Sequence, residues 1–215
     1  MNQTKPEMIA VIGDLYESRK IQKRQLFGQS LKMALIKINK EYATHIFAPL
    51  RTVRGIDEIS GVLNRPDFSF EICARVNEEI YPAKIRWGIG TGSIDVNKQT
   101  KDAGAIDGPA FHNAAAAMKR ARKEGLVYAF YMPQTADVSV ALIESSAQLY
   151  SEIIMTWTEK SAEVARAMRK TQTQSAAAEM LNLSPQRISQ IMKRGSLKVL
   201  TDFEHTMSWY LSETL

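Results

Sequence analysis

Patterns typical of β-strands stop at Pro133, and every later segment of this 215-residue chain has the apolar spacing of a helix. Before Pro133, strand-like runs alternate with helical ones. The strand-like runs are residues 8–13, 44–53, 58–63, 84–90 and 126–132, and the helical ones are residues 21–42, 67–80 and 110–123. This order begins with the split β-α-β arrangement of ferredoxin-like folds. The sequence therefore predicts an α+β fold, in which helices cover one face of an antiparallel sheet, followed by an all-α part.

Three regions follow from this division: an α+β domain over residues 1–133, connecting helices over 134–170, and a helix-turn-helix domain over 171–215. Pro49, inside the second strand-like run, predicts an edge strand or a bulge. The first helical run is predicted to bury one face, which carries Leu26, Leu31, Ala34, Leu35 and Ile38. The last run is predicted to buttress the helix-turn-helix or a dimer through Leu200, Phe203, Met207 and Leu211.

Composition excludes several classes of protein. With 45% hydrophobic and 24% charged residues, the chain is typical of globular proteins rather than disordered or collagen-like ones. No apolar run reaches the roughly 20 residues that a membrane-spanning helix requires, and Met1–Glu7 lacks the apolar core of a signal peptide. The single cysteine, Cys73, can form no internal disulfide and is expected to be a small buried hydrophobe. We therefore expect a cytoplasmic protein with no membrane partner.

Positive charge is concentrated near the C-terminus. The chain has a net charge of +5, and residues 160–198 alone hold eight basic residues against the two acids Glu163 and Glu179. The eight are Lys160, Arg166, Arg169, Lys170, Arg187, Lys193, Arg194 and Lys198. Such a block in a helical segment is typical of contact with a phosphate backbone. The alternative is an ordinary solvated helical face, and composition alone does not choose between the two.

The segment Gln174–Lys193 has the local pattern of a helix-turn-helix. Ala177 and Ala178 are small enough to let a second helix cross the first closely. Asn182 stands where the turn requires a positive φ, which Asn tolerates better than most residues. Ser184 is a good N-cap, and Pro185 fits the first position of the second helix. Leu183, Ile188, Ile191 and Met192 are expected to face inward.

The second helix of this motif presents polar side chains that can bond base edges or phosphates in a DNA major groove. They are Ser184, Gln186, Arg187, Ser189 and Gln190, with Lys193 and Arg194 near the flanking backbone. The stretch resembles the helix-turn-helix of sigma-factor region four and related bacterial regulators. The alternative is a helical hairpin that only packs.

Four segments of the first half resemble the SatD family of bacterial proteins. They are Ile12–Lys20 (IGDLYESRK), Gly55–Leu63 (GIDEISGVL), Ile85–Gly92 (IRWGIGTG) and Asp107–Asn113 (DGPAFHN), within residues 8–130. The family in turn resembles the class III nucleotide cyclases distantly. The resemblance implies a cyclase-like sheet, with Mg²⁺ and a nucleotide as candidate cofactors.

If the metal-binding positions implied by the resemblance are carried over to this sequence, Asp14 and Asp57 are the metal-binding carboxylates, with Glu58 beside them. Paired carboxylates can hold Mg²⁺ against a triphosphate. Gly13, Gly88 and Gly90 would let a nucleotide approach the backbone. This chain departs from the family pattern at the hairpin, where Ile56 precedes the acid and Ser60 replaces Gln. Because Ile does not readily adopt a positive φ, we expect a distorted hairpin.

Three hypotheses remain open. The first is a DNA-binding transcriptional regulator that acts as a homodimer, since one recognition helix buries little surface; its N-terminal domain would serve dimerisation or the sensing of a small nucleotide. The second is a Mg²⁺-dependent nucleotide-binding or cyclase-like enzyme. The third is an adaptor whose helical half docks a partner protein.

Overall fold

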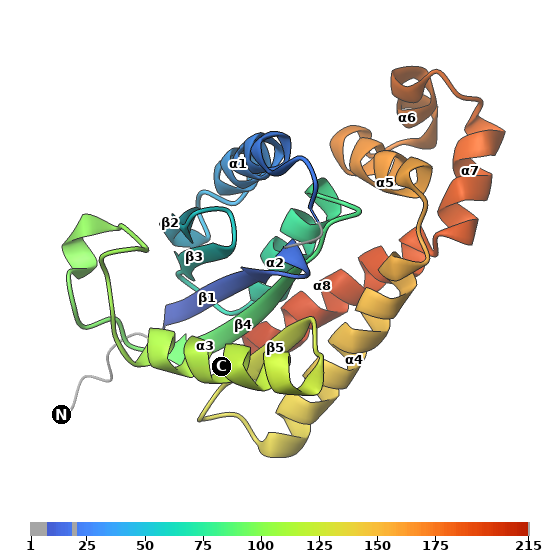
Figure 1. Cartoon of the computed structure of the whole chain (residues 1–215). Coiled ribbons are helices and arrows are strands. Elements are labelled where there is room, and N and C mark those ends of the chain that lie inside the picture. Colours follow the sequence, from blue (N-terminus) through green and yellow to red (C-terminus); the bar gives the residue numbers. More distant parts are fainter. Residues whose placement is uncertain (1–7, 19–20, 215) are drawn as a thin grey trace.

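The computed structural model describes residues 8–18 and 21–214, and Figure 1 shows their arrangement. The last two residues of the segment Ile12–Lys20 and the residues Met1–Glu7 lie outside this part.

The strands are β1 (Met8–Leu15), β2 (Ile46–Arg54), β3 (Glu58–Leu63), β4 (Ile85–Gly92) and β5 (Tyr128–Tyr131). The α-helices are α1 (Arg24–Glu41), α2 (Ser69–Glu79), α3 (Pro109–Glu124), α4 (Asp137–Met155), α5 (Glu159–Thr171), α6 (Gln174–Leu181), α7 (Pro185–Arg194) and α8 (Leu197–Thr214), and a short 3₁₀ helix, η2, spans Lys98–Thr100. The α+β class is confirmed.

The five strands form one sheet in the order β2-β3-β1-β4-β5. The pairs β2–β3, β1–β3 and β1–β4 are antiparallel, so β3 separates β1 from β2. The expectation of a purely antiparallel sheet is wrong at one edge, because β5 pairs with β4 in parallel. The physical reason is α3, which carries the chain from β4 back to the start of β5 and so makes a parallel crossover.

Helices cover both faces of the sheet, not the one face that the sequence predicted (Figure 1). Ile9 and Val11 of β1 point into the core shared with α1 and α2, whereas Met8 and Ala10 pack with α3. The backbone of α3 lies very close to β4. A Cβ atom placed on Gly90 would stand 2.1 Å from the amide nitrogen of Ala114.

Most element boundaries agree with the sequence prediction to within about three residues, because apolar periodicity and turn residues determine them locally. Pro49 lies in an edge strand, and the β2–β3 register shifts between Ala48 and Arg51. Leu26 is an error of the prediction: it is 56% exposed, because the buried face of α1 begins only at Leu31. Cys73 is fully buried, as expected.

Helix α8 shares a hydrophobic core with the sheet domain. The ring of Phe203 lies 5.4 Å from that of Phe70 on α2 and 5.5 Å from that of Tyr150 on α4. Leu200 and Met207 are buried in the same cluster as β1 and α2. In Figure 1, α4 and α8 run beside each other, and α5, α6 and α7 lie together at one end of the molecule. Among the described residues, no helix combines the length and apolar character needed to cross a membrane.

Candidate functional site

Helices α6 and α7 form the hairpin that the sequence predicted. The side chain of Thr173 accepts a hydrogen bond from the Ala176 amide and begins α6. The Ser184 hydroxyl accepts one from the Arg187 amide at 3.2 Å and begins α7. Asn182 ends α6 in the left-handed region, at φ 51° and ψ 49°. The caps and the turn therefore adopt the conformations that their residue types favour.

Small and branched apolar residues hold α6 and α7 together. Ala177, Ala178, Ile188 and Ile191 are buried, and the Leu183 amide bonds the Ala178 carbonyl oxygen at 2.9 Å. Helix α5 packs against both helices, so the unit consists of three helices. The sequence analysis assigned α5 to a connecting segment. The capping box at Thr158 and Ser161, where α5 begins, is a signal that could have located the start of this helix but not its packing partner.

The polar side chains predicted to read DNA all stand on the surface. Ser184, Gln186, Arg187, Ser189, Gln190, Lys193 and Arg194 are exposed. Several of them recur at the three- and four-residue spacing that places side chains on one face of a helix. The Arg187 guanidinium makes one long contact, 3.5 Å from Nη1 to the Gln190 Oε1 atom. This surface, which we call the α7 face, offers amide, hydroxyl and cationic groups together.

Only part of the basic block is available to a partner. Lys160 pairs with Glu163 on the same helix. Arg166 donates to the Glu78 carbonyl oxygen, 2.8 Å away, and Arg169 pairs with two buried carboxylates. The other five cations of the block are Lys170, Arg187, Lys193, Arg194 and Lys198, and all five are exposed. The charge that could contact phosphate therefore lies mainly on α7 and beside it.

Arg169 anchors α5 to the sheet domain and to α8. Its guanidinium lies 2.8 Å from Glu78 on α2 and 2.7 Å from Glu204 on α8, and both carboxylates are almost fully buried. Arg75, itself buried, pairs with Glu78 at 2.8 Å. Burial alone would lower the pKa of Arg169, but the charge of Glu78 and the hydrogen bonds to Glu204 raise it above its ordinary value. Sequence patterns gave no indication of this network, because its members lie far apart in the chain.

The two carboxylates expected to bind metal are each held by arginines. Asp14 lies 2.9 Å from Arg122 on α3 and 3.7 Å from Arg86 on β4. Asp57 lies 3.1 Å from Arg24, at the start of α1. Since α1 and α3 cover opposite faces of the sheet, the two carboxylates do not converge on one site. Within the described residues, no three His, Cys, Asp or Glu side chains are grouped to hold a metal ion.

The glycines proposed for cofactor binding are in contact with protein. The positions where Gly88 and Gly90 would carry a Cβ atom are filled by the backbone of α3, and that of Gly13 by the side chains of Ile85 and Trp87. These glycines therefore serve close packing rather than access for a nucleotide. The strain expected at Ile56 does not arise, because the positive φ, 59°, falls on Gly55. The β2–β3 register nevertheless shifts between Thr52 and Arg54, directly beside this turn.

Three of the four segments that resemble the SatD family line one cavity of about 410 Å³. Ile12 comes from the first segment, Ser60 from the second and Phe111 from the fourth. Arg54, Glu58 and Asp107 add charge to the wall. The cavity lies on the α3 side of the sheet, but neither Asp14 nor Asp57 lines it.

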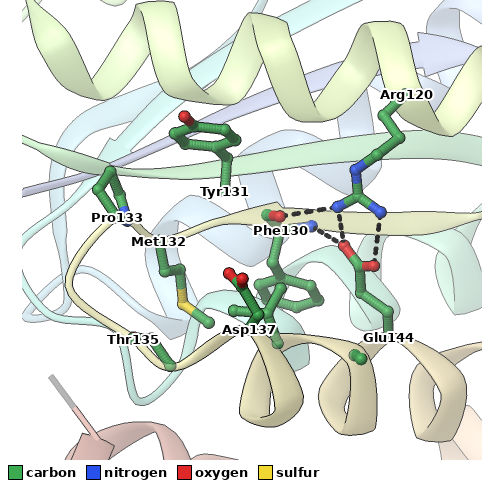
Figure 2. Close-up of a pocket in the computed structure, with 10 residues that line it drawn as sticks. Arg120, Phe130, Tyr131, Met132, Pro133, Thr135, Asp137 and Glu144 are labelled. Atoms are coloured by element: carbon green, nitrogen blue, oxygen red, sulfur yellow. Dashed lines mark hydrogen bonds and ion pairs between the residues drawn. The ribbon is translucent and has the colours of Figure 1, made fainter.

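A second cavity, of about 460 Å³, lies between α3, α4 and the end of β5 (Figure 2). The Glu144 carboxylate accepts a hydrogen bond from the Phe130 amide at 2.6 Å, and Arg120 donates to the Phe130 carbonyl oxygen at 2.9 Å. Figure 2 shows that Arg120 and Glu144 also pair with each other. This ion pair thus satisfies the amide and the carbonyl oxygen of Phe130, on an edge strand that could otherwise pair with another chain at this position.

The comparisons with known proteins identify one family. The model of the SatD family matches residues 8–207, which include the helical half as well as the segments recognised in the sequence. No curated protein matches the chain. One solved structure is similar over 98% of this chain and 86% of its own: the regulator of polyketide synthase expression from Bifidobacterium adolescentis, at 12% identity and a TM-score of 0.24. That TM-score is too low to support any statement about this chain.

Proposed function

The chain belongs to the SatD family, and we propose that it is a DNA-binding transcriptional regulator that reads DNA with α7. The observation that carries the proposal is the α7 face: six exposed polar or cationic side chains on α7, together with the exposed Ser184 that caps this helix. A helix presented in this way fits a major groove. Binding to DNA implies the cytoplasmic location expected from the sequence.

The decisive experiment is a salt-dependent titration of the full chain against mixed genomic DNA fragments. Arg187→Ala is expected to weaken binding about 5- to 150-fold if the side chain reads a base, and less if it contacts phosphate. Lys119→Ala, which removes one positive charge from an exposed position on α3, is the matched control and should leave the affinity unchanged. Absence of binding by the wild-type chain at low salt would overturn the proposal. If the two variants weaken DNA binding equally, the α7 face is not part of the DNA interface.

We place the homodimer contact on α4. This helix exposes Val138, Leu142 and Leu149, the last two by 62% and 67%. Two copies of α4, packed antiparallel about a two-fold axis between Ser145 and Ser146, would set Leu142 against Leu149 of the second copy. Val138 would likewise meet Ile153. This stripe is therefore self-complementary, as a two-fold interface requires.

Leu142→Arg is expected to weaken dimerisation at least about tenfold, because it places a charge in an apolar contact. Light scattering during size-exclusion chromatography over a dilution series measures the change. Met33→Arg on α1, where the native side chain is 64% exposed, is the matched control. A wild-type chain that is monomeric at every concentration contradicts the dimer, and equal loss in both variants contradicts the interface.

The N-terminal domain was expected to serve dimerisation or ligand sensing; with the dimer contact placed on α4, ligand sensing is the role left to it in this proposal. The alternative, a Mg²⁺-dependent nucleotide or cyclase-like enzyme, is supported by the family resemblance of the sheet segments alone. The ion pairs of Asp14 with Arg122 and of Asp57 with Arg24 disfavour it, because they occupy the carboxylates that such chemistry would use. The adaptor hypothesis is disfavoured by the positive charge of the α7 face.

A further inference from the structure

A third cavity lies where the three-helix unit meets the rest of the molecule. Its volume is about 530 Å³, which suits a small organic ligand. Its walls come from the end of α1, from α2, from the α4–α5 turn, and from α5, α7 and α8. A ligand bound there would contact α5 and α7 on one side and the sheet domain on the other. No feature of the sequence indicated such a site, because its walls come from six separate segments.

Much of the interior of this cavity is apolar and aromatic. Tyr42, Trp157 and Leu200 are buried in its wall, and Met168 of α5 and Met192 of α7 lie partly buried beside them. The indole of Trp157 donates to the Gly195 carbonyl oxygen, 2.8 Å away, so this ring is fixed against the end of α7. Such a lining favours a ligand with an apolar body, and its rings can also attract a cation.

The cavity wall carries three carboxylates and three cations, and two further carboxylates lie directly behind it. The carboxylates at the wall or directly behind it are Glu41, Glu71, Glu78, Asp202 and Glu204, against the cations Arg75, Arg169 and Lys198. Both arginines are already engaged by Glu78, with Glu41 and Glu204 as further partners. Among the described residues, the Asp202 carboxylate has no ion pair, and Glu71 bonds only the Tyr42 hydroxyl. Outside the ion pairs of the two arginines, the wall carries the two carboxylates Glu71 and Asp202 against the one cation Lys198, so negative charge predominates there.

We propose that this cavity binds an organic cation with an apolar body, and that its occupancy changes the affinity of the α7 face for DNA. The cation would lie near Asp202 and Glu71, and the apolar body against Trp157 and Leu200. A ligand shifts DNA affinity only if it binds the DNA-competent arrangement more or less tightly than the alternative. Contact with Met192 on α7 and Gln172 at the end of α5 supplies that difference. This second part rests on the proposed DNA-binding function, whereas the first does not.

Two ions of nearly the same shape and opposite charge test the first part without DNA. Isothermal titration of the full chain should show tetraphenylphosphonium binding at least about tenfold more tightly than tetraphenylborate. Asp202→Asn, at an exposed position, should weaken the phosphonium about 5- to 10-fold without disturbing the fold. Asp137→Asn, the same change at an exposed position on α4 outside this cavity, should have no effect. Equal affinity for the two ions, or equal effects of the two variants, overturns the site.

The second part is tested by repeating the DNA titration with saturating tetraphenylphosphonium. The dissociation constant for DNA should change at least about fivefold in the wild-type chain. The change should be smaller in Asp202→Asn at the same phosphonium concentration, which controls for any effect of the ion on DNA itself. An unchanged constant in a chain that binds the ion overturns the regulatory part. If the chain binds the ion but never DNA, the proposed function fails while the cavity assignment stands.

Discussion

Deletion of residues 171–215 is expected to unfold the whole chain rather than to release a folded N-terminal domain. These residues include α8, whose Leu200, Met207 and Leu211 are buried in the same core as the sheet and α2. Phe203 packs edge-on against Phe70 of α2. Burial of the three side chains Leu200, Met207 and Leu211 stabilises a fold by about 4.5–9 kcal/mol, and the partly buried Phe203 adds to this. The free energy of unfolding of a whole domain is only about 5–15 kcal/mol.

Circular dichroism and thermal melting of the fragment 1–170 against the full chain measure this effect. The fragment should lack the cooperative melting transition of the full chain. Point variants on α8 provide a matched pair. Leu211→Ala, at a fully buried position, should destabilise the chain by about 2–5 kcal/mol, whereas Trp209→Ala, at a position 65% exposed, should change stability by about 0.5 kcal/mol or less. A fragment that melts cooperatively near the temperature of the full chain would show two independent domains.

The sequence was informative wherever structure depends on neighbouring residues. Ser184, Pro185 and Asn182 specify the α6–α7 turn through their own backbone preferences, so its conformation could be predicted. The face that α3 covers could not be predicted from apolar spacing alone. Gly88 and Gly90, two residues apart, leave one side of β4 without side chains, and this pattern allows a helix to pack closely there. Read in that way, the two glycines predict helix packing rather than a nucleotide site.

The α7 face and the cavity also differ in whether neighbouring residues determine them. The α7 face is a property of one helix, and its seven residues were all identified in the sequence. The cavity walled by Trp157 and Asp202 depends on packing between distant segments, so no local pattern could reveal it. Arg169 is the clearest example of a role that the sequence alone does not reveal. It was counted as part of a DNA-binding basic block, yet its partners Glu78 and Glu204 bury its charge inside the protein.

Arg169→Met is expected to lower the free energy of unfolding by about 3–5 kcal/mol, because it leaves carboxylates buried without a compensating charge. For a chain of this length the melting temperature should fall by roughly 6–20 °C. Among the described residues, Glu204 would lose its one ion-pair partner and keep the hydrogen bond from the Tyr150 hydroxyl, whereas Glu78 would keep its ion pair with Arg75. Lys170→Met, at the exposed neighbouring position, should change stability by about 0.5 kcal/mol or less.

A double variant separates loss of charge balance from loss of packing. Replacing Glu204 by Gln in the Arg169→Met background removes the unpaired charge and keeps the shape of the side chain. If uncompensated charge causes the loss, this double variant should recover a large part of the stability, measured by urea unfolding at neutral pH. If the double variant regains stability and binds DNA as tightly as the wild type, Arg169 anchors α5 without contacting DNA. If the Arg169→Met variant is as stable as the wild type but binds DNA weakly, Arg169 contacts DNA phosphate instead.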